Sequence, residues 1–399
     1  MGPKSFGTRS VHAGEDRHRY ADSITTPIVQ SSTFVFKDTK DIVDYTKHGK
    51  LRFEYGRYGG PTEKVAQERL ANLDGAEDCL LFSSGMSAII TTILALVRSG
   101  DHIVLTDDAY KKTLEFCNGY IQRFGVDCTI VPFGDYDALD AAVRPATRFI
   151  FSESPTNPYL NIFDLDLLRK TAKKHNVLTL IDSTFATPFN QRPLEFGVDL
   201  VLHSCTKYLA GHNDILAGVV LGRKELVEQV RVMHKAIGGC IDPHCTYLLL
   251  RGLKTFPLRV ARQNETCMTV ARFLEGHPCV KKVYYPGLES HPHHNIAKEQ
   301  MSGYGGVVSF DVKGNLASAK RFLDSLKLCF IGPSLGGVET LITHPGLVTY
   351  YDRTRKERYK IGISDTLIRL AVGVEDVGDI IADLDQALNR SRRAGGKKG

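Results

Sequence analysis

The sequence has no uninterrupted apolar run of the length that spans a membrane and no closely spaced cysteine pair. A membrane helix needs ~18 or more apolar residues in succession, and no apolar core of a signal peptide follows the first residues. The nine cysteines are scattered, and none forms a Cys-x-x-Cys pair, which argues against a structural zinc site or a disulfide framework. We therefore expect a cytoplasmic protein with reduced thiols and no membrane contact.

The sequence also has little net charge outside its C-terminal end. The formal net charge is +6, and residues 390–399 supply five cations and no anion. We predict that residues 389–399 form a disordered basic tail. A nucleic-acid interface needs a basic patch with interleaved aromatic residues on a folded surface, and the remaining chain, which is nearly neutral, does not indicate one.

The pattern of polar and apolar residues predicts three structured parts. Residues 1–60 are rich in Thr, Ser, Tyr and Gly and lack long amphipathic repeats, so we expect an extended arm that lies on a neighbouring surface. Residues 61–258 alternate short apolar strands with helices, which predicts an α/β domain with a mostly parallel sheet covered on both faces. Residues 259–388 predict a smaller α/β domain whose strands are mainly antiparallel.

Apolar runs place the strands of both domains. In the first domain we predict strands at 79–82, 102–105, 128–132, 148–151, 177–181 and 198–202, and in the second at 280–285, 306–312 and 367–372. Ligands of parallel sheets bind at the carboxyl ends of the strands. The residues that follow each strand of the first domain are therefore candidates for a site.

Polar residues follow several of these strands. Ser84-Gly85-Met86 opens a helix, and backbone N–H groups at a helix start attract phosphate. Asp182 ends a buried strand, where an acid is costly without a partner; it would otherwise cap a helix. Lys207, in His203-Ser204-Cys205-Thr206-Lys207, follows another apolar strand. Its alternatives are a surface charge, an ion-pair partner and a nucleophile.

Together these residues match the groups of one ligand, pyridoxal 5'-phosphate (PLP). A lysine forms a Schiff base with its aldehyde, and an acid pairs with its pyridinium nitrogen. We predict that Lys207 and Asp182 have these roles and that Tyr110, after the strand 102–105, stacks on the ring. The alternative is a coincidence at four strand ends. The predicted phosphate contacts are Gly85, Met86, Ser204 and Thr206.

The motifs that carry a wider resemblance are Tyr55-x-Arg57, Ser84-Gly85-Met86, Glu153-x-Pro155-x-Asn157-Pro158, Asp182, Ser204-x-Thr206-Lys207-Tyr208 and Ser334-Leu335-Gly336-Gly337. The chain, from about residue 7 to 388, resembles the trans-sulfuration (Cys/Met metabolism) family of PLP-dependent enzymes. The resemblance implies the aspartate-aminotransferase-like fold (PLP fold type I) and a homotetramer built from dimers.

The resemblance also implies residue roles. Lys207 would be the Schiff-base lysine and proton carrier, and Tyr55 and Arg57 would reach the phosphate of a neighbouring subunit. The substrate α-carboxylate would be held by Asn157, Ser334 and Arg369. Arg369 suits this role because a guanidinium grips a carboxylate with two hydrogen bonds.

Local features look like plant-type cystathionine γ-synthases. Lys111-Lys112 follows Tyr110, and Pro333 precedes Ser334, where many lyases have glutamate. We predict that Lys112 offsets an anionic leaving group; its alternative is a solvated charge. Glu54 is a candidate contact for the amino group of the nucleophile, or a surface glutamate. Gly60 departs from the family pattern, which usually has asparagine there.

The expected reaction is γ-replacement on an O-activated homoserine, in which cysteine adds to give cystathionine. The alternatives are a cystathionine γ-lyase, a homoserine sulfhydrylase or methionine γ-lyase, and a scaffold without catalytic activity. A metal site at His291-Pro292-His293-His294 is a weaker alternative, because adjacent histidines in such a loop usually face solvent. We expect no metal.

Overall fold

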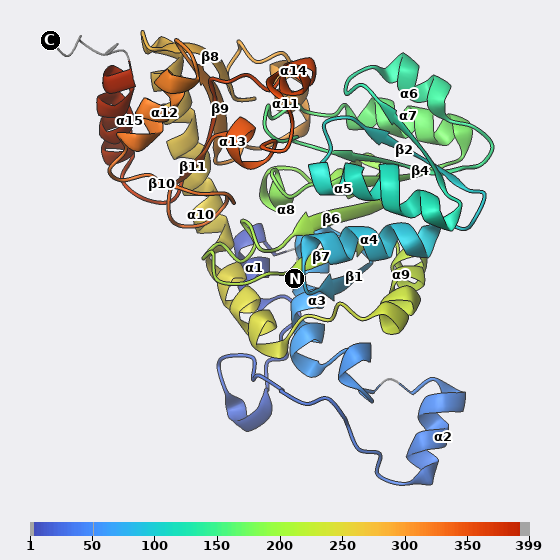
Figure 1. Ribbon diagram of the computed structural model, residues 1–399. Coiled ribbons are helices and arrows are strands. Elements are labelled where there is room, and N and C mark those ends of the chain that lie inside the picture. Colours follow the sequence, from blue (N-terminus) through green and yellow to red (C-terminus); the bar gives the residue numbers. More distant parts are fainter. Residues whose placement is uncertain (1–3, 51, 392–399) are drawn as a thin grey trace, which may run out of the picture.

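The computed structural model describes residues 4–50 and 52–391, which fold into two α/β units and a projecting N-terminal arm (Figure 1). The larger unit is built on a seven-stranded sheet of the described residues with the order β1-β7-β6-β5-β4-β2-β3. Its strands are β1 (Asp78–Phe82), β2 (His102–Thr106), β3 (Asp127–Val131), β4 (Thr147–Glu153), β5 (Leu178–Asp182), β6 (Leu200–Ser204) and β7 (Gly218–Gly222).

The sheet is mostly parallel, as predicted. The strands β6, β5, β4, β2 and β3 run in one direction, and β7 is antiparallel to both β6 and β1. The apolar runs predicted the other six strands but not β7. This strand is completely buried, but it begins and ends with glycine, Gly218 and Gly222, which weakens a strand signal.

Alternate residues of the buried strands face two separate apolar layers. On β2, Ile103 and Leu105 pack in one cluster, while Val104 packs in the other. The first layer includes α4 (Gly85–Leu96) and α9 (Lys224–Ile237), and the second includes α6 (Tyr136–Ala142) and α7 (Leu165–His175). Both faces are covered, which explains why the strands read as continuous apolar runs.

The smaller unit contains a second sheet with the order β10-β11-β12-β9-β8. Its ladders are antiparallel except for the parallel pair β10 and β11. The sequence pattern did not predict these two strands, because they have only two and three residues. The strands are β8 (Val280–Tyr284), β9 (Val307–Val312), β10 (Phe330–Ile331), β11 (Leu341–Thr343) and β12 (Leu367–Ala371).

The remaining helices complete both units and the arm. They are α1 (Phe6–His12), α2 (Thr39–His48), α3 (Pro61–Asp74), α5 (Lys111–Glu115), α8 (Thr187–Asn190), α10 (Pro243–Gly276), α11 (His294–Gln300), α12 (Leu316–Asp324), α13 (Pro345–Val348), α14 (Arg355–Lys360) and α15 (Val377–Ser391). None of the helices in the described part of the chain is both long and apolar enough to cross a membrane.

The boundary predicted between residues 258 and 259 lies inside the 34-residue helix α10. This helix starts with Pro243 after Asp242, whose side chain accepts hydrogen bonds from the first turn. It contacts α1 and α3 of the larger unit and β8, β9 and α15 of the smaller one. The division of the chain into domains stays a prediction, and at this point no loop marks it.

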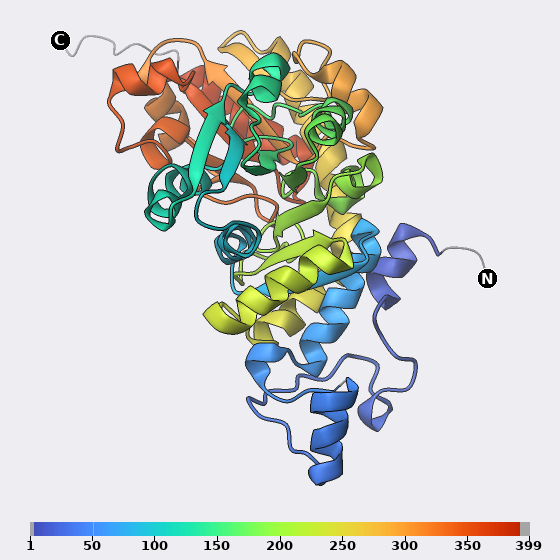
Figure 2. The ribbon, with the colours of Figure 1, turned by 90° about the vertical axis from the view of Figure 1, so that its right-hand side faces the viewer.

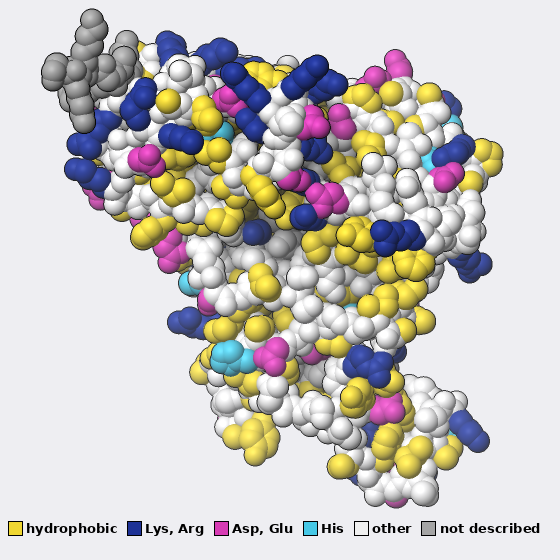
Figure 3. Space-filling model, viewed as in Figure 1, with side chains coloured by type: hydrophobic (Ala, Val, Ile, Leu, Met, Phe, Trp, Pro, Cys, Tyr) yellow, Lys and Arg dark blue, Asp and Glu magenta, His cyan; other side chains and the backbone are white. Residues whose placement is uncertain are grey.

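The arm projects from the body in both ribbon views (Figures 1 and 2). We predicted an extended arm, but it is not extended throughout, because residues 1–60 include α1 and α2, and the Asp38 side chain caps the start of α2. The arm exposes large apolar side chains: Tyr20, Ile24 and Val35 are 85%, 84% and 86% exposed. Hydrophobic side chains are visible on this projection in the space-filling view (Figure 3). Such a surface is typical of one that meets another chain. The predicted contact with a neighbouring subunit stays a prediction.

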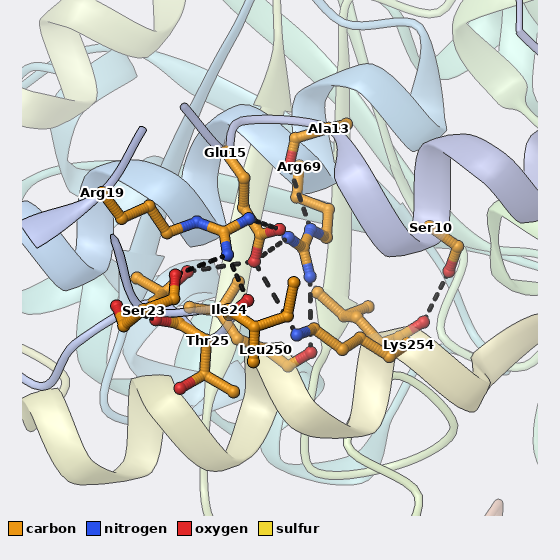
Figure 4. A network of polar contacts seen from close by, with 12 residues as sticks. Ser10, Ala13, Glu15, Arg19, Ser23, Ile24, Thr25, Arg69, Leu250 and Lys254 are labelled. Carbon is orange, nitrogen blue, oxygen red and sulfur yellow. Dashed lines mark hydrogen bonds and ion pairs between the residues drawn. The ribbon is translucent and has the colours of Figure 1, made fainter. Parts of the chain in front are cut away.

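A charged network attaches the base of the arm to the larger unit (Figure 4). Glu15 pairs with Arg19 of the arm and, at 2.8 Å, with Arg69 of α3. Lys254 of α10 lies 3.9 Å from the same carboxylate. Arg69 is fully buried, so its charge depends on Glu15 for compensation.

The end of the described chain is helical where we predicted a disordered tail. Residues 389–391, which we assigned to the disordered tail, form the last turn of α15. Ser391 is buried, and its hydroxyl donates to the Leu388 carbonyl at 2.6 Å. The helix continues because Leu384 and Leu388 anchor its apolar face in the core. The rest of the predicted tail lies outside the described residues.

Candidate active site

A cavity of about 360 Å³ lies at the carboxyl ends of β4, β5 and β6 and is closed on its other side by residues of the smaller unit. It brings together ten of the residues predicted from the sequence. They are Gly85, Met86, Tyr110, Asn157, Asp182, Ser204, Thr206, Lys207, Ser334 and Arg369.

One end of the cavity is formed by the start of α4. Ser84 caps this helix by accepting a hydrogen bond from Ser87 N at 3.1 Å, and Gly85 and Met86 are its first residues. Backbone N–H groups in a first helical turn have no partner within the helix and attract anions. A Cβ atom on Gly85 would lie 3.0 Å from the Cβ of Ser204. Only a glycine lets α4 approach β6 this closely.

Asp182 lies in the middle of the cavity at the end of β5. Its carboxylate accepts a hydrogen bond from Thr184 N at 2.9 Å. Burial raises the pKa of Asp182, and the hydrogen bonds from Thr184 oppose this shift. A nearby cation would therefore stabilise the ionised carboxylate. The structure thus places a buried acid, whose pKa the charge of His203 also lowers, where a pyridinium nitrogen would stabilise its ionised form.

Glu153 is a second buried acid, which our sequence analysis did not assign to the site. It ends β4 and pairs in register with Asp182 of β5. Its Oε1 accepts a hydrogen bond from Tyr110 N at 2.5 Å. Burial, followed by the charge on Asp182, raises the pKa of Glu153 well above its ordinary value. The signal that identified Asp182, an acid at a strand end, applied equally to Glu153.

Lys207 lies in the turn after β6, and its amine donates to Ser334 Oγ at 2.9 Å. Burial, followed by the charge of Arg369, lowers the pKa of Lys207 to about 8. The amine is thus more readily deprotonated than that of an ordinary lysine. Ser334 has φ of +86°, which is unfavourable for a residue with a side chain. Strain of this kind concentrates at functional sites.

Arg369 reaches the cavity from β12 of the smaller unit. It is 8% exposed, and it donates to Asn157 Oδ1 at 3.2 Å and to the Ser334 carbonyl at 2.8 Å. Its Nε has no hydrogen-bond partner among the residues that the structure describes. Burial lowers the pKa of Arg369 to about 10, so the guanidinium is charged at neutral pH. An unpaired donor on a buried cation suits a carboxylate ligand.

Four predicted site residues do not line this cavity. Arg57 donates to the Lys235 carbonyl, and Tyr55 beside it is 41% exposed. Glu54 accepts from the Tyr45 hydroxyl at 2.9 Å. Lys112 donates to Glu115 at 2.6 Å, and its side chain is 60% exposed.

Lys111 is closer to the cavity than Lys112. Its amine donates to the Thr349 carbonyl at 3.1 Å and pairs with Asp352 at 2.5 Å. Thr349 lines the cavity, so Lys111 ties α5 to the cavity wall. The sequence showed both lysines but not which of them faces the smaller unit.

The histidines at and before the start of α11 form hydrogen bonds with backbone groups. His291 bonds to the Tyr159 carbonyl at 3.1 Å, and His294 bonds to the Pro286 carbonyl at 2.8 Å. His293 accepts from Ile162 N at 3.3 Å. Within the described ranges, no group of three or more His, Cys, Asp or Glu side chains is arranged to hold a metal ion.

The family model described as "Cys/Met metabolism PLP-dependent enzyme" matches residues 7–389 of the chain. The chain belongs to this family. Its coenzyme is therefore PLP, and the fold is that of the PLP-dependent synthases and lyases of the family, as predicted.

Three family members illustrate the similarity. Cystathionine gamma-synthase 1, chloroplastic, of Arabidopsis thaliana is 46% identical over 387 residues, which cover 96% of this chain and 69% of that protein. L-methionine gamma-lyase of Fusobacterium nucleatum is 42% identical over 400 residues, covering 98% and 99% of the two chains. The crystal structure of cystathionine gamma-lyase from Lactobacillus plantarum with L-serine has a TM-score of 0.90 at 36% identity, covering 98% of this chain and 100% of that chain.

The residues of the cavity fit the family's coenzyme. The start of α4 with Ser204 and Thr206 offers donors for a phosphate, and Gly85 lets α4 lie close to Ser204. A pyridinium nitrogen would stabilise the ionised carboxylate of Asp182, and Lys207 offers a buried amine for the aldehyde. Tyr110 lines the same cavity and is 42% exposed, which leaves its ring available to a planar ligand.

Proposed function

We propose that the protein catalyses γ-replacement on an O-activated homoserine, with cysteine as the nucleophile and cystathionine as the product. The observation that carries this proposal is the meeting of Lys207 and Arg369 at Ser334. A titratable amine thereby lies beside a charged guanidinium inside one cavity. This arrangement suits an amino-acid substrate that has a carboxylate on Cα and a removable proton on Cα or Cβ.

Each side chain has a defined task in this reaction. The bound coenzyme supplies an electron-withdrawing ring that stabilises negative charge on the substrate. Lys207 takes protons from Cα and Cβ and returns them, and its pKa of about 8 suits proton transfer in both directions. Arg369, Asn157 and Ser334 hold the α-carboxylate. The Cγ–O bond breaks, the leaving group departs with its electron pair, and the cysteine sulfur forms the new bond to Cγ as its thiol proton is lost.

Two observations favour a synthase among the related activities. The synthase from Arabidopsis thaliana shares 46% identity with this chain. In addition, Pro333, which lines the cavity beside Ser334, is the residue that resembles plant-type synthases. We propose phosphate or succinate as the leaving group. Lys112 would meet it after turning away from Glu115, and Glu54 would contact the nucleophile from a neighbouring subunit.

The second candidate function is γ-elimination, in which cystathionine yields cysteine, 2-oxobutyrate and ammonia. The 42% identity to a methionine γ-lyase and the TM-score of 0.90 to a cystathionine γ-lyase support it. Both reactions need the same cavity residues up to departure of the γ-substituent, and differ in whether a thiol then adds.

We also propose that the active protein is a homotetramer, assembled from two dimers, and that it is located in the cytoplasm. The exposed apolar side chains of the arm support an assembly. Sedimentation of the holoenzyme and fractionation of the source cells test these two points.

A substrate panel tests the reaction. The holoenzyme is incubated with phosphoryl-, succinyl- and acetyl-homoserine, each with cysteine or sulfide, and separately with cystathionine alone. We expect cystathionine to form from an anionic ester and cysteine, with little 2-oxobutyrate. Rapid release of 2-oxobutyrate and cysteine from cystathionine would instead establish the γ-lyase.

A further inference from the structure

A second cavity, of about 180 Å³, lies apart from the cofactor cavity, between the start of α3 and the C-terminal part of α9. We call it the Gly60 pocket, and its polar lining includes Arg57, Gly60, Glu63, His234, Lys235 and Cys240. None of these residues lines the cofactor cavity. Its volume is below the roughly 300–1,000 Å³ of drug-sized sites, so it suits a small metabolite.

The pocket is open where Gly60 has no side chain. Gly60 precedes the first residue of α3 with φ of −142° and ψ of 168°, a conformation that any residue adopts. A Cβ atom added to it would meet no atom within 4 Å among the described residues. Neither the backbone nor packing thus requires glycine here, and the family pattern usually has asparagine. The missing side chain leaves the space.

Two buried groups offer acceptors to a ligand. Glu63 is 9% exposed, and His234 is 6% exposed and packs edge-on against Phe82. His234 Nε2 has no hydrogen-bond partner within the described part of the chain, although a buried polar atom normally has one.

Both groups can accept a hydrogen bond at neutral pH. Burial, followed by the charge of Arg231, lowers the pKa of His234 to about 4, so the ring is neutral at pH 7. Burial raises the pKa of Glu63 to about 7. A neutral imidazole can accept one hydrogen bond, and an ammonium group donates three.

Four cations also line the pocket. Arg231 is paired with Asp78 and Glu228, and Lys64 with Glu68. The Arg57 guanidinium donates to the Lys235 carbonyl and lies 5.2 Å from the centre of the Tyr58 ring, and the amine of Lys235 lies 5.8 Å from the same ring. Arg57 and Lys235 are both half-buried. These two cations and the two acceptors in one lining match a small molecule with one carboxylate and one ammonium group.

We propose that the Gly60 pocket binds a small α-amino acid and that its occupation sets the position of Arg57. The amino group lies at Glu63 and His234, and the carboxylate lies at Arg57 and Lys235. The second part rests on the proposed function, in which Arg57 reaches the coenzyme phosphate of a neighbouring subunit. An amino acid in this pocket would then regulate how tightly that subunit holds its coenzyme.

The binding test uses holoenzyme reduced with borohydride, so that the coenzyme is fixed and the cofactor cavity is blocked. The twenty common L-amino acids are titrated singly by calorimetry. We expect at least one to bind the reduced wild type. Gly60 is the N-cap residue of α3, so Gly60→Asn adds an amide side chain to the pocket lining and should weaken that binding by at least ~10-fold. The variant Glu63→Gln should weaken it similarly while leaving the volume unchanged.

Gly119→Asn is the matched control, because Gly119 also has open space at its Cβ position and lies outside both cavities. It should bind the amino acid normally. If no amino acid binds, or if Gly60→Asn binds it as well as the wild type does, the proposal is wrong. Absence of amino-acid binding is also the result expected if a neighbouring subunit fills the pocket.

The regulatory part has a separate readout. The amino acid that binds should change the rate at which unreduced holoenzyme loses its coenzyme, measured from the loss of visible absorbance, and Gly60→Asn should abolish this change. Binding without any change in coenzyme release would overturn the regulatory part. A failure of the proposed function appears elsewhere, as absent cystathionine formation in the substrate panel, and leaves amino-acid binding to the reduced protein unaffected.

Discussion

The floor of the cofactor cavity and the predicted outer contacts are built in different ways. The floor, which we define as Gly85, Asp182, Ser204, Thr206 and Lys207, comes from the ends of neighbouring strands and the start of one helix, and these residues line one cavity. The outer contacts, Glu54, Tyr55, Arg57 and Lys112, lie outside that cavity and have other partners or face solvent.

This difference shows which part of the site a single chain positions by itself. The backbone hydrogen bonds of a parallel sheet fix where adjacent strands end, so residues at those ends meet regardless of side-chain conformation. The outer contacts depend on a flexible lysine or on a second subunit. The predictions below test this comparison, beginning with the floor.

The largest effect is expected for Lys207→Ala. It removes the side chain to which we assign the Schiff base and the proton transfer, so steady-state turnover should fall at least ~10³-fold. Lys298→Ala, which replaces an exposed lysine of α11, is the control and should keep wild-type turnover. Turnover of Lys207→Ala within tenfold of the wild type would place the catalytic lysine elsewhere.

Arg57 tests whether the outer contacts act across subunits. Arg57→Ala and Lys207→Ala subunits, each nearly inactive alone, are co-expressed with different tags. Half of randomly mixed dimers contain both subunits, and each has one site without either change, so activity should recover to about a quarter of the wild type. No recovery would mean that Arg57 acts within its own subunit.

Arg369→Leu should raise KM for the amino-acid substrate by ~10–100-fold, because a hydrogen-bonded charge pair contributes about 1.5–3 kcal/mol. The change in kcat should be smaller. Arg369→Lys keeps the charge but not the two parallel hydrogen bonds, so its KM should lie between those of the wild type and Arg369→Leu. Thermal unfolding of each variant checks that the contacts of Arg369 with Asn157 and Ser334 are not needed for folding. Equal KM values for Arg369→Leu and the wild type would remove Arg369 from the carboxylate site.

The pH dependence of coenzyme loading reports the environment of Lys207. Only the neutral amine attacks an aldehyde, and its pKa is lowered to about 8. About one tenth of the amine is then neutral at pH 7. The rate at which the apoenzyme takes up PLP, followed by visible absorbance, should rise with pH up to about 8 and then level off. A rate that still rises tenfold per unit above pH 9 would indicate an ordinary lysine.

The smallest effect is expected for Lys112→Ala. The amine is bonded to the exposed Glu115, so it has to exchange one partner for another. We expect KM to rise about threefold for phosphorylated homoserine and to stay unchanged for acetylated homoserine, which is the range for an exposed ion pair. Equal changes for both substrates would show that Lys112 does not sense the leaving group.

The sequence predicted the floor because its residues directly follow apolar strands. It did not identify Glu153 as a site residue, although this acid has the same signal as Asp182. It also missed β7, which begins and ends with glycine, and β10 and β11, which are too short to have a pattern. The partners of Lys111, Thr349 and Asp352, could not be predicted because they lie far along the chain. The partner of Lys112, Glu115, could not be predicted because the contact depends on side-chain conformation.

The most direct test of this account is to locate the coenzyme on the chain. The holoenzyme is treated with borohydride, digested and mapped by mass spectrometry. We expect the reduced coenzyme on the peptide that contains Lys207. Finding it on the Lys111-Lys112 peptide, on another lysine, or on no peptide would contradict the account.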